Sequence, residues 1–132
     1  MKRLGLVPAL GLMLAFALAA CGSAASPLPT GVVNLSLLAG PTCPVERIPP
    51  DPNCAPRPVA DAEIIVLTAD GREVTRVKSD AAGHITLRLP LGDYILRPVA
   101  AAGGFPMAPA ETPVRVTAAP TELTLDYDTG IR

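Results

Sequence analysis

The stretch PVADAEIIVLTADGREVTRVKSDAAGHITLRLPLGDYILRP, residues 58–98, decides the fold. Apolar and polar residues alternate along it, most clearly at Ile85, Leu87 and Leu89, and turn residues interrupt the alternation three times. A period of two bounded by turns is typical of strands with one buried face. The stretch therefore predicts four short strands. The second of them, residues 73–78, has its two valines three positions apart, which predicts an edge strand with a bulge.

Shorter alternating runs on either side of this stretch predict three further strands. Their inward-facing residues are Val33, Leu35 and Leu37 in the first, Val114 and Val116 in the second, and Leu123, Leu125 and Tyr127 in the third. One-sided strands bury their apolar faces when two sheets close on each other, so an all-β sandwich over residues 31–132 is expected. Phe105 and Met107 lie in a Gly/Ala/Pro-rich loop, where we expect them to cap the core rather than form an apolar lip.

Three motifs in the central stretch resemble the carboxypeptidase regulatory-like domain. They are Pro-Val-x-x-Ala at 58–62, Asp-x-x-Gly at 80–83 and Leu-Pro-x-Gly-x-Tyr-x-Leu at 89–96. The resemblance implies a seven-stranded, prealbumin-like (transthyretin-type) β-sandwich. Members of that family act mostly as accessory or adhesive modules, which implies such a role here, although a fold does not by itself fix a function.

Residues 1–20 are typical of a signal peptide. Lys2 and Arg3 precede an uncharged apolar run, residues 4–18, which is short for a membrane-spanning helix of roughly 20 residues. The alternatives are a plain secretory signal and a membrane anchor. No positively charged flank follows the run, which favours a segment that is removed on export.

Leu-Ala-Ala-Cys at residues 18–21 resembles a bacterial lipobox. The resemblance implies that Cys21 becomes the lipidated first residue of the mature chain, attached to a membrane and exported from the cytoplasm. Residues 22–30 are uncharged and rich in Gly, Ser, Ala and Pro, so residues 21–30 are predicted to be a lipid anchor with a flexible tether. Such a tether reaches at most about 30 Å, at roughly 3.5 Å per residue.

The composition excludes several classes of partner. The chain has 11 basic and 12 acidic residues, and removal of Lys2 and Arg3 with the signal leaves nine against twelve, a net charge of −3. A net negative charge does not favour binding to nucleic acid, whose phosphates are also negative. With no Trp, two Tyr and two Phe, the chain offers no aromatic platform for stacking sugars or bases.

The segment GPTCPVERIPPDPNCAPRPVA, residues 40–60, is the least ordinary part of the chain. Seven of the sixteen prolines lie in it, so it cannot be a helix or a central strand. With Cys21 assigned to lipid, Cys43 and Cys54 are expected to form a disulfide in an oxidising compartment. The segment is either a ligand or partner site or a structural staple with solvated charges. The site residues would be Glu46, Arg47, Asp51, Asn53 and Arg57.

No catalytic residue, metal or cofactor is expected. Two cysteines eleven apart with no nearby histidine do not match zinc spacing. The related hydroxyisourate hydrolases use two histidines, an arginine and a C-terminal Tyr-Arg-Gly-Ser, whereas this chain has only His84 and ends Tyr-Asp-Thr-Gly-Ile-Arg. Asp126 and Asp128 share a strand face about 7 Å apart, which is within reach of acid–base chemistry, but solvated surface acids are the ordinary explanation.

A covalent Lys–Asn bond, as in prealbumin-like pilin and adhesin modules, is a third possibility. Lys78 is the only lysine after the signal, and Asn34 and Asn53 are the amide candidates, but an edge lysine facing water does not suit a bond that needs burial.

The sequence therefore predicts a non-enzymatic, lipid-anchored envelope lipoprotein that presents a small β-sandwich as a binding or accessory module. The alternative is a structural subunit of an envelope complex. It would dock on another envelope protein through a sheet edge or through a leftover apolar face at Ile65, Leu67 and Ile95. The identity of a small-molecule ligand is not predicted.

Overall fold

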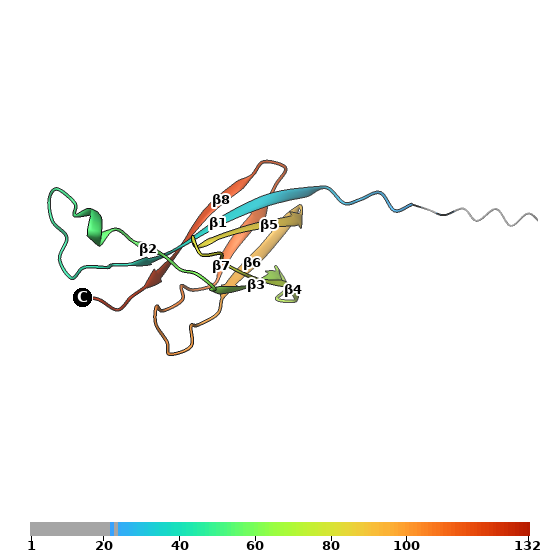
Figure 1. The fold of residues 1–132 in the computed structure, drawn as a ribbon. Coiled ribbons are helices and arrows are strands. Elements are labelled where there is room, and N and C mark those ends of the chain that lie inside the picture. The colour runs from blue at the N-terminus through green and yellow to red at the C-terminus, as the bar shows by residue number, and fades with distance from the viewer. Residues whose placement is uncertain (1–21, 23) are drawn as a thin grey trace, which may run out of the picture.

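A computed structural model describes residues 22 and 24–132, which fold into two packed four-stranded sheets (Figure 1). The predicted signal segment and Cys21 lie outside the described residues. In the described part of the chain, no helix is long and apolar enough to cross a membrane. The strands are β1 Thr30–Gly40, β2 Arg57–Pro58, β3 Glu63–Thr68, β4 Glu73–Lys78, β5 His84–Pro90, β6 Gly92–Pro98, β7 Thr112–Val116 and β8 Thr121–Asp128, with a 3-10 turn, η1, at Pro52–Cys54.

Strand β1 is the axis of the first sheet. One of its edges pairs antiparallel with β5 along its first half and with the short β2 near its end. The other edge pairs parallel with β8 from Val33 to Gly40. The second sheet has the order β4-β3-β6-β7, all antiparallel. The all-β sandwich expected from the alternation is confirmed, with β2 as a two-residue addition to the seven predicted strands.

The core lies between the two sheets and consists of the residues that the alternation placed inward. Val33 and Leu37 of β1, Ile64 and Val66 of β3, and Leu96 of β6 are completely buried. Burying an aliphatic side chain of this size contributes about 1.5–3 kcal/mol, so these positions dominate the stability of the domain.

The predicted bulge is present in the edge strand β4. Val66 pairs with Thr75 and Leu67 pairs with Glu73, so Val74 is the extra residue between them. The bulge turns Val74 outward and lets Val77 pack against the core. Both features predicted for residues 73–78, the edge position and the irregularity, are therefore confirmed.

Two expectations about apolar side chains are wrong. Phe105 is 60% exposed and Met107 41% exposed, so neither caps the core. Ile65 and Leu67, expected on an open apolar face, are only 9% and 2% exposed, and Ile95 is half-buried.

The outer face of the second sheet carries arginines beside its apolar residues. Ile65 pairs in register with Arg76 on β4 and with Arg97 on β6. Each arginine also forms an ion pair with a glutamate, and a side chain held in this way can cover apolar surface with its aliphatic stem. The leftover apolar face is therefore mostly covered.

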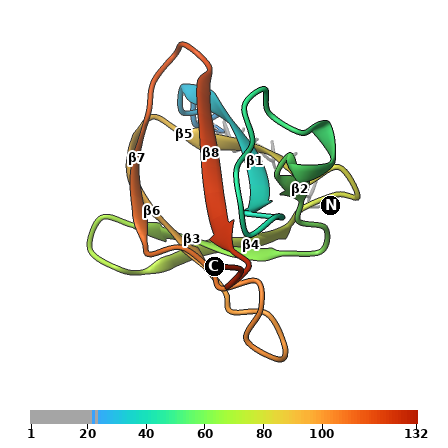
Figure 2. The same ribbon diagram turned by 90° about the vertical axis from the view of Figure 1, so that its left-hand side faces the viewer.

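The two ends of the sandwich differ in what they carry. β1 runs from the N-terminal segment at one end to the loop of residues 41–56 at the other (Figure 1). Figure 2 views the second end, where this loop, the C-terminus and the 99–111 loop surround the ends of β1 and β8. At about 3.3 Å per residue, the eleven residues of β1 separate the two ends by roughly 35 Å.

Candidate functional site

The candidate site is the loop of residues 41–56, which leaves β1 and returns as β2. Cys43 and Cys54 form the expected disulfide, with their Cα atoms 5.3 Å apart. The prolines explain why most of the loop has no regular structure, since each lacks an N–H group and has a fixed φ. We call the twelve residues 43–54 the clamped ring.

One arm of the clamped ring is folded by Asp51, which caps η1. Its Oδ1 accepts hydrogen bonds from the backbone N–H and the side-chain Nδ2 of Asn53, at 2.9 and 3.0 Å. Its carbonyl oxygen accepts from the Cys54 N–H at 2.9 Å. Asp51 and Asn53, both expected to contact a ligand, are thus hydrogen-bonded to each other, and these bonds stabilise the local fold of the ring.

The base of the loop is attached to the sandwich on two sides. On one side β2 pairs with β1, with Arg57 opposite Ala39. On the other side Thr129, just after β8, donates its N–H to the Gly40 carbonyl at 3.1 Å and its hydroxyl to the Pro41 carbonyl. These contacts fix the base while leaving the rest of the ring free of the sandwich.

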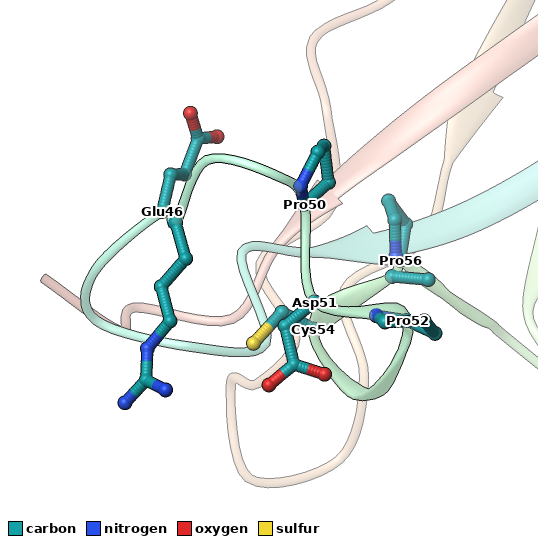
Figure 3. Close-up of a pocket in the computed structure, with 8 residues that line it drawn as sticks. Glu46, Pro50, Asp51, Pro52, Cys54 and Pro56 are labelled. Carbon is teal, nitrogen blue, oxygen red and sulfur yellow. The ribbon is translucent and has the colours of Figure 1, made fainter.

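A hollow of about 550 Å³ opens on the clamped ring (Figure 3). Of the five predicted site residues, Glu46, Arg47 and Asp51 line it, whereas Asn53 and Arg57 do not. In Figure 3, the loop runs from Glu46 round to Pro50 and then past Asp51 toward Cys54. The remaining lining residues are Pro50, Pro52, Cys54, Ala55 and Pro56.

The outer arm of the ring, residues 44–50, is exposed along its whole length. Every residue from 44 to 50 is exposed, with Val45 at 67% and Ile48 at 100%. Within the described residues, neither Glu46 nor Arg47 forms an ion pair or a side-chain hydrogen bond. Val45 and Ile48 were not among the predicted site residues, although two apolar residues lying between prolines in a disulfide-closed loop could have indicated them.

The strongly lowered pKa at this end of the molecule belongs to a residue beside the loop, not to a residue of the loop. The pKa of Asp128 is lowered to about 2, first because Arg132 hydrogen-bonds to its carboxylate and second because the Gly130 N–H does so. This arrangement folds the C-terminal residues back onto the end of β8. Asp126 and Asp128 do not form an acid–base pair, because Asp128 is engaged with Arg132.

A second hollow, of about 430 Å³, lies near the start of β3 and includes Lys78 and Tyr127 among its lining residues. The Tyr127 hydroxyl is the only buried side-chain polar atom among the described residues that lacks a hydrogen-bond partner. Burial raises the pKa of this phenol, so it remains neutral.

The residues that a metal site or a Lys–Asn bond would need do not come together in the described part of the chain. Within the described residues, no group of three or more His, Cys, Asp and Glu could hold a metal ion. His84 is exposed at the start of β5. Asn34 lies on β1 and bonds to Glu122 and Thr86, whereas Lys78 lies on β4 in the other sheet, so the two do not form a Lys–Asn pair.

Comparison with protein families matches residues 55–129, more than half of the chain, to SpaA, a prealbumin-like fold domain. The match confirms the prealbumin-like fold. The finer resemblance to the carboxypeptidase regulatory-like domain stays a prediction. No curated protein matches the chain.

Solved structures with the same fold include three pilins. The minor pilin GBS52 of Streptococcus agalactiae is 19% identical with a TM-score of 0.60, covering 77% of this chain and 45% of the pilin. The shaft pilin SpaA of Lactobacillus rhamnosus GG is 10% identical with a TM-score of 0.58, covering 76% and 51%. The major pilin BcpA of Bacillus cereus is 17% identical with a TM-score of 0.53, covering 76% and 30%. The chain thus spans about half or less of each pilin, and at these identities the similarity is one of fold.

Proposed function

Because the chain belongs to the family of SpaA prealbumin-like fold domains, we propose that it is a non-enzymatic structural module of the bacterial cell envelope. It is held at a membrane through lipidated Cys21 and contacts an envelope protein through the clamped ring. Residues 1–20 are the signal, residues 21–30 the lipid anchor and tether, and residues 31–132 the sandwich. The structural role is supported by the three pilins that share the fold.

The observation that carries this proposal is the placement of the ring at the end of the sandwich opposite the N-terminal segment (Figure 1). In a chain anchored at Cys21, the ring would lie at the end of the sandwich farther from the anchored segment, where a partner can reach it. The disulfide and the prolines restrict the loop before binding, which reduces the entropy lost when a partner engages it.

The lipid anchor is tested by replacing Cys21. The full chain, expressed in a bacterium with its signal, is expected to incorporate radiolabelled palmitate and to fractionate with membranes. Cys21→Ser should lose both the label and the membrane attachment, while Cys43→Ser/Cys54→Ser should keep both. Equal labelling of the Cys21→Ser chain would contradict lipidation at this position.

The contact surface is tested by two matched changes on separate faces. Glu46→Arg/Arg47→Glu reverses both charges of the ring, and Glu73→Arg/Arg76→Glu exchanges an exposed pair on the edge strand β4. If an envelope protein docks on the ring, crosslinked partners from intact cells disappear only with the first variant. Their loss with the second variant alone would assign docking to the sheet edge, which is the alternative structural role.

A further inference from the structure

The outer arm of the ring, residues 44–50, has the sequence Pro-Val-Glu-Arg-Ile-Pro-Pro. All seven residues are exposed, and within the described residues none of them forms a backbone hydrogen bond with another part of the chain. The carbonyl and N–H groups of its non-proline residues, Val45 to Ile48, are therefore open to pairing with another protein. A binding cleft that engages a peptide through main-chain hydrogen bonds could therefore reach these groups.

Arg47 determines which kind of cleft this would be. It lies near the middle of the arm, is exposed and has no ionic partner in the described chain. Trypsin-like serine proteases accept one cationic side chain of the bound peptide in a pocket whose base is an aspartate. With Arg47 in that pocket, the peptide bond between Arg47 and Ile48 would be the one exposed to cleavage. Pro49 would then be the second residue after that bond.

The attachment of the ring determines whether such a protease would cleave and release the arm. Both ends of the arm are joined by the Cys43–Cys54 disulfide, and the base is paired with β1 through β2. If the peptide bond after Arg47 were hydrolysed by water, the new carboxylate and the new amine would remain held near each other. Prolines at 44, 49 and 50 further restrict the arm, so that less entropy is lost on binding.

We propose that the clamped ring is a substrate-like inhibitory loop for trypsin-like serine proteases, with Arg47 as the specificity-determining residue. The proposal gives the ring a second kind of partner, a protease rather than an envelope protein, and rests on the proposed role of the ring as an exposed contact site. It does not depend on the lipid anchor. A protein displayed on an envelope with such a loop would occupy the active sites of proteases that approach the surface.

The test is inhibition of trypsin by the full chain, expressed with its signal and purified with its disulfide intact from whichever fraction, membrane or soluble, contains it. Competitive inhibition of a small chromogenic substrate is expected, with much weaker inhibition of chymotrypsin, whose pocket is apolar. Arg47→Ala should raise the inhibition constant by about 100-fold, the cost of removing a charged anchor from a desolvated pocket. Arg47→Lys should retain inhibition.

Arg57→Ala is the matched control, since Arg57 is exposed but lies on β2 outside the ring. Its inhibition constant should equal that of the unchanged protein. Reduction of the disulfide should turn the inhibitor into a substrate cleaved after Arg47, as mass spectrometry would show. Absence of inhibition by the intact chain, with or without rapid cleavage after Arg47, would overturn the proposal. The crosslinking experiment above reports separately on an envelope partner.

Discussion

Replacing Gly31 with alanine should destabilise the domain by forcing β1 and the residues after β7 apart at the end of the sandwich that carries the N-terminal segment. A Cβ atom added to Gly31 would lie 2.8 Å from Val116 Cγ1 and closer still to the Thr117 carbonyl oxygen. Real Cβ contacts essentially never fall under 3.0 Å, so the backbone after β7 must move. Overpacking of this kind costs about 1–3 kcal/mol, and the upper half of that range applies because the neighbour is rigid backbone.

The measurement is urea unfolding of the full chain followed by circular dichroism, with Gly40→Ala as control. Gly40 ends the same strand, and a Cβ there would meet only Pro56, at an ordinary 3.7 Å. Gly31→Ala should lower the free energy of unfolding by about 2–3 kcal/mol and Tm by roughly 10 °C or more. Gly40→Ala should change the free energy of unfolding much less. Equal effects of the two substitutions would refute the close approach of β1 and the residues after β7.

Three further predictions concern the ring end of the molecule. Cys43→Ser/Cys54→Ser should lower the free energy of unfolding by about 3 kcal/mol, since it frees a twelve-residue ring in the unfolded chain; unchanged urea unfolding would contradict this. Tyr127→Phe removes a buried hydroxyl without a partner and should raise the free energy of unfolding by about 1 kcal/mol; a loss of stability would point to a hydrogen bond to water. The pKa of Asp128 is lowered from 3.8 to about 2, so its stabilising contribution is complete above pH 3.8 and is lost as the pH falls through 2. Arg132→Ala should raise this pKa in an NMR titration. An unchanged pKa would argue against the pairing of Asp128 with Arg132.

The strands could be predicted from the sequence because alternation is a local property. Ile85, Leu87 and Leu89 face the core as their spacing requires, and the three-residue spacing of Val74 and Val77 required a bulge. The two-residue β2 could not be predicted, since its pairing depends on the return path of a proline-rich loop.

The burial of Ile65 and Leu67 on the outer face of the second sheet could not be predicted from the sequence for a different reason. Ile65 and Leu67 follow the pattern of an exposed face, but Arg76 and Arg97 arrive beside Ile65 from the two neighbouring strands. Which long side chain lies over which apolar residue depends on strand order and register, and neither is encoded locally.

The candidate site was predictable in outline only. Assigning Cys21 to lipid and expecting export to an oxidising compartment left Cys43 and Cys54 as a pair, and the disulfide is present. The charged residues could not be separated by role, because Asp51 serves as a cap and Arg57 joins a sheet, whereas Glu46 and Arg47 stay exposed. These roles depend on local backbone conformation within a proline-rich segment, where alternation gives no information.

The placement of β1 also determines how the molecule would respond to pulling. The N-terminal segment enters β1 at Thr30, and the ring leaves it after Gly40, so the covalent backbone of one strand joins the two. A force between a membrane and a protein gripping the ring would travel along that strand and bypass the remaining sandwich. The domain could stay folded under tension while its outer loop held a partner.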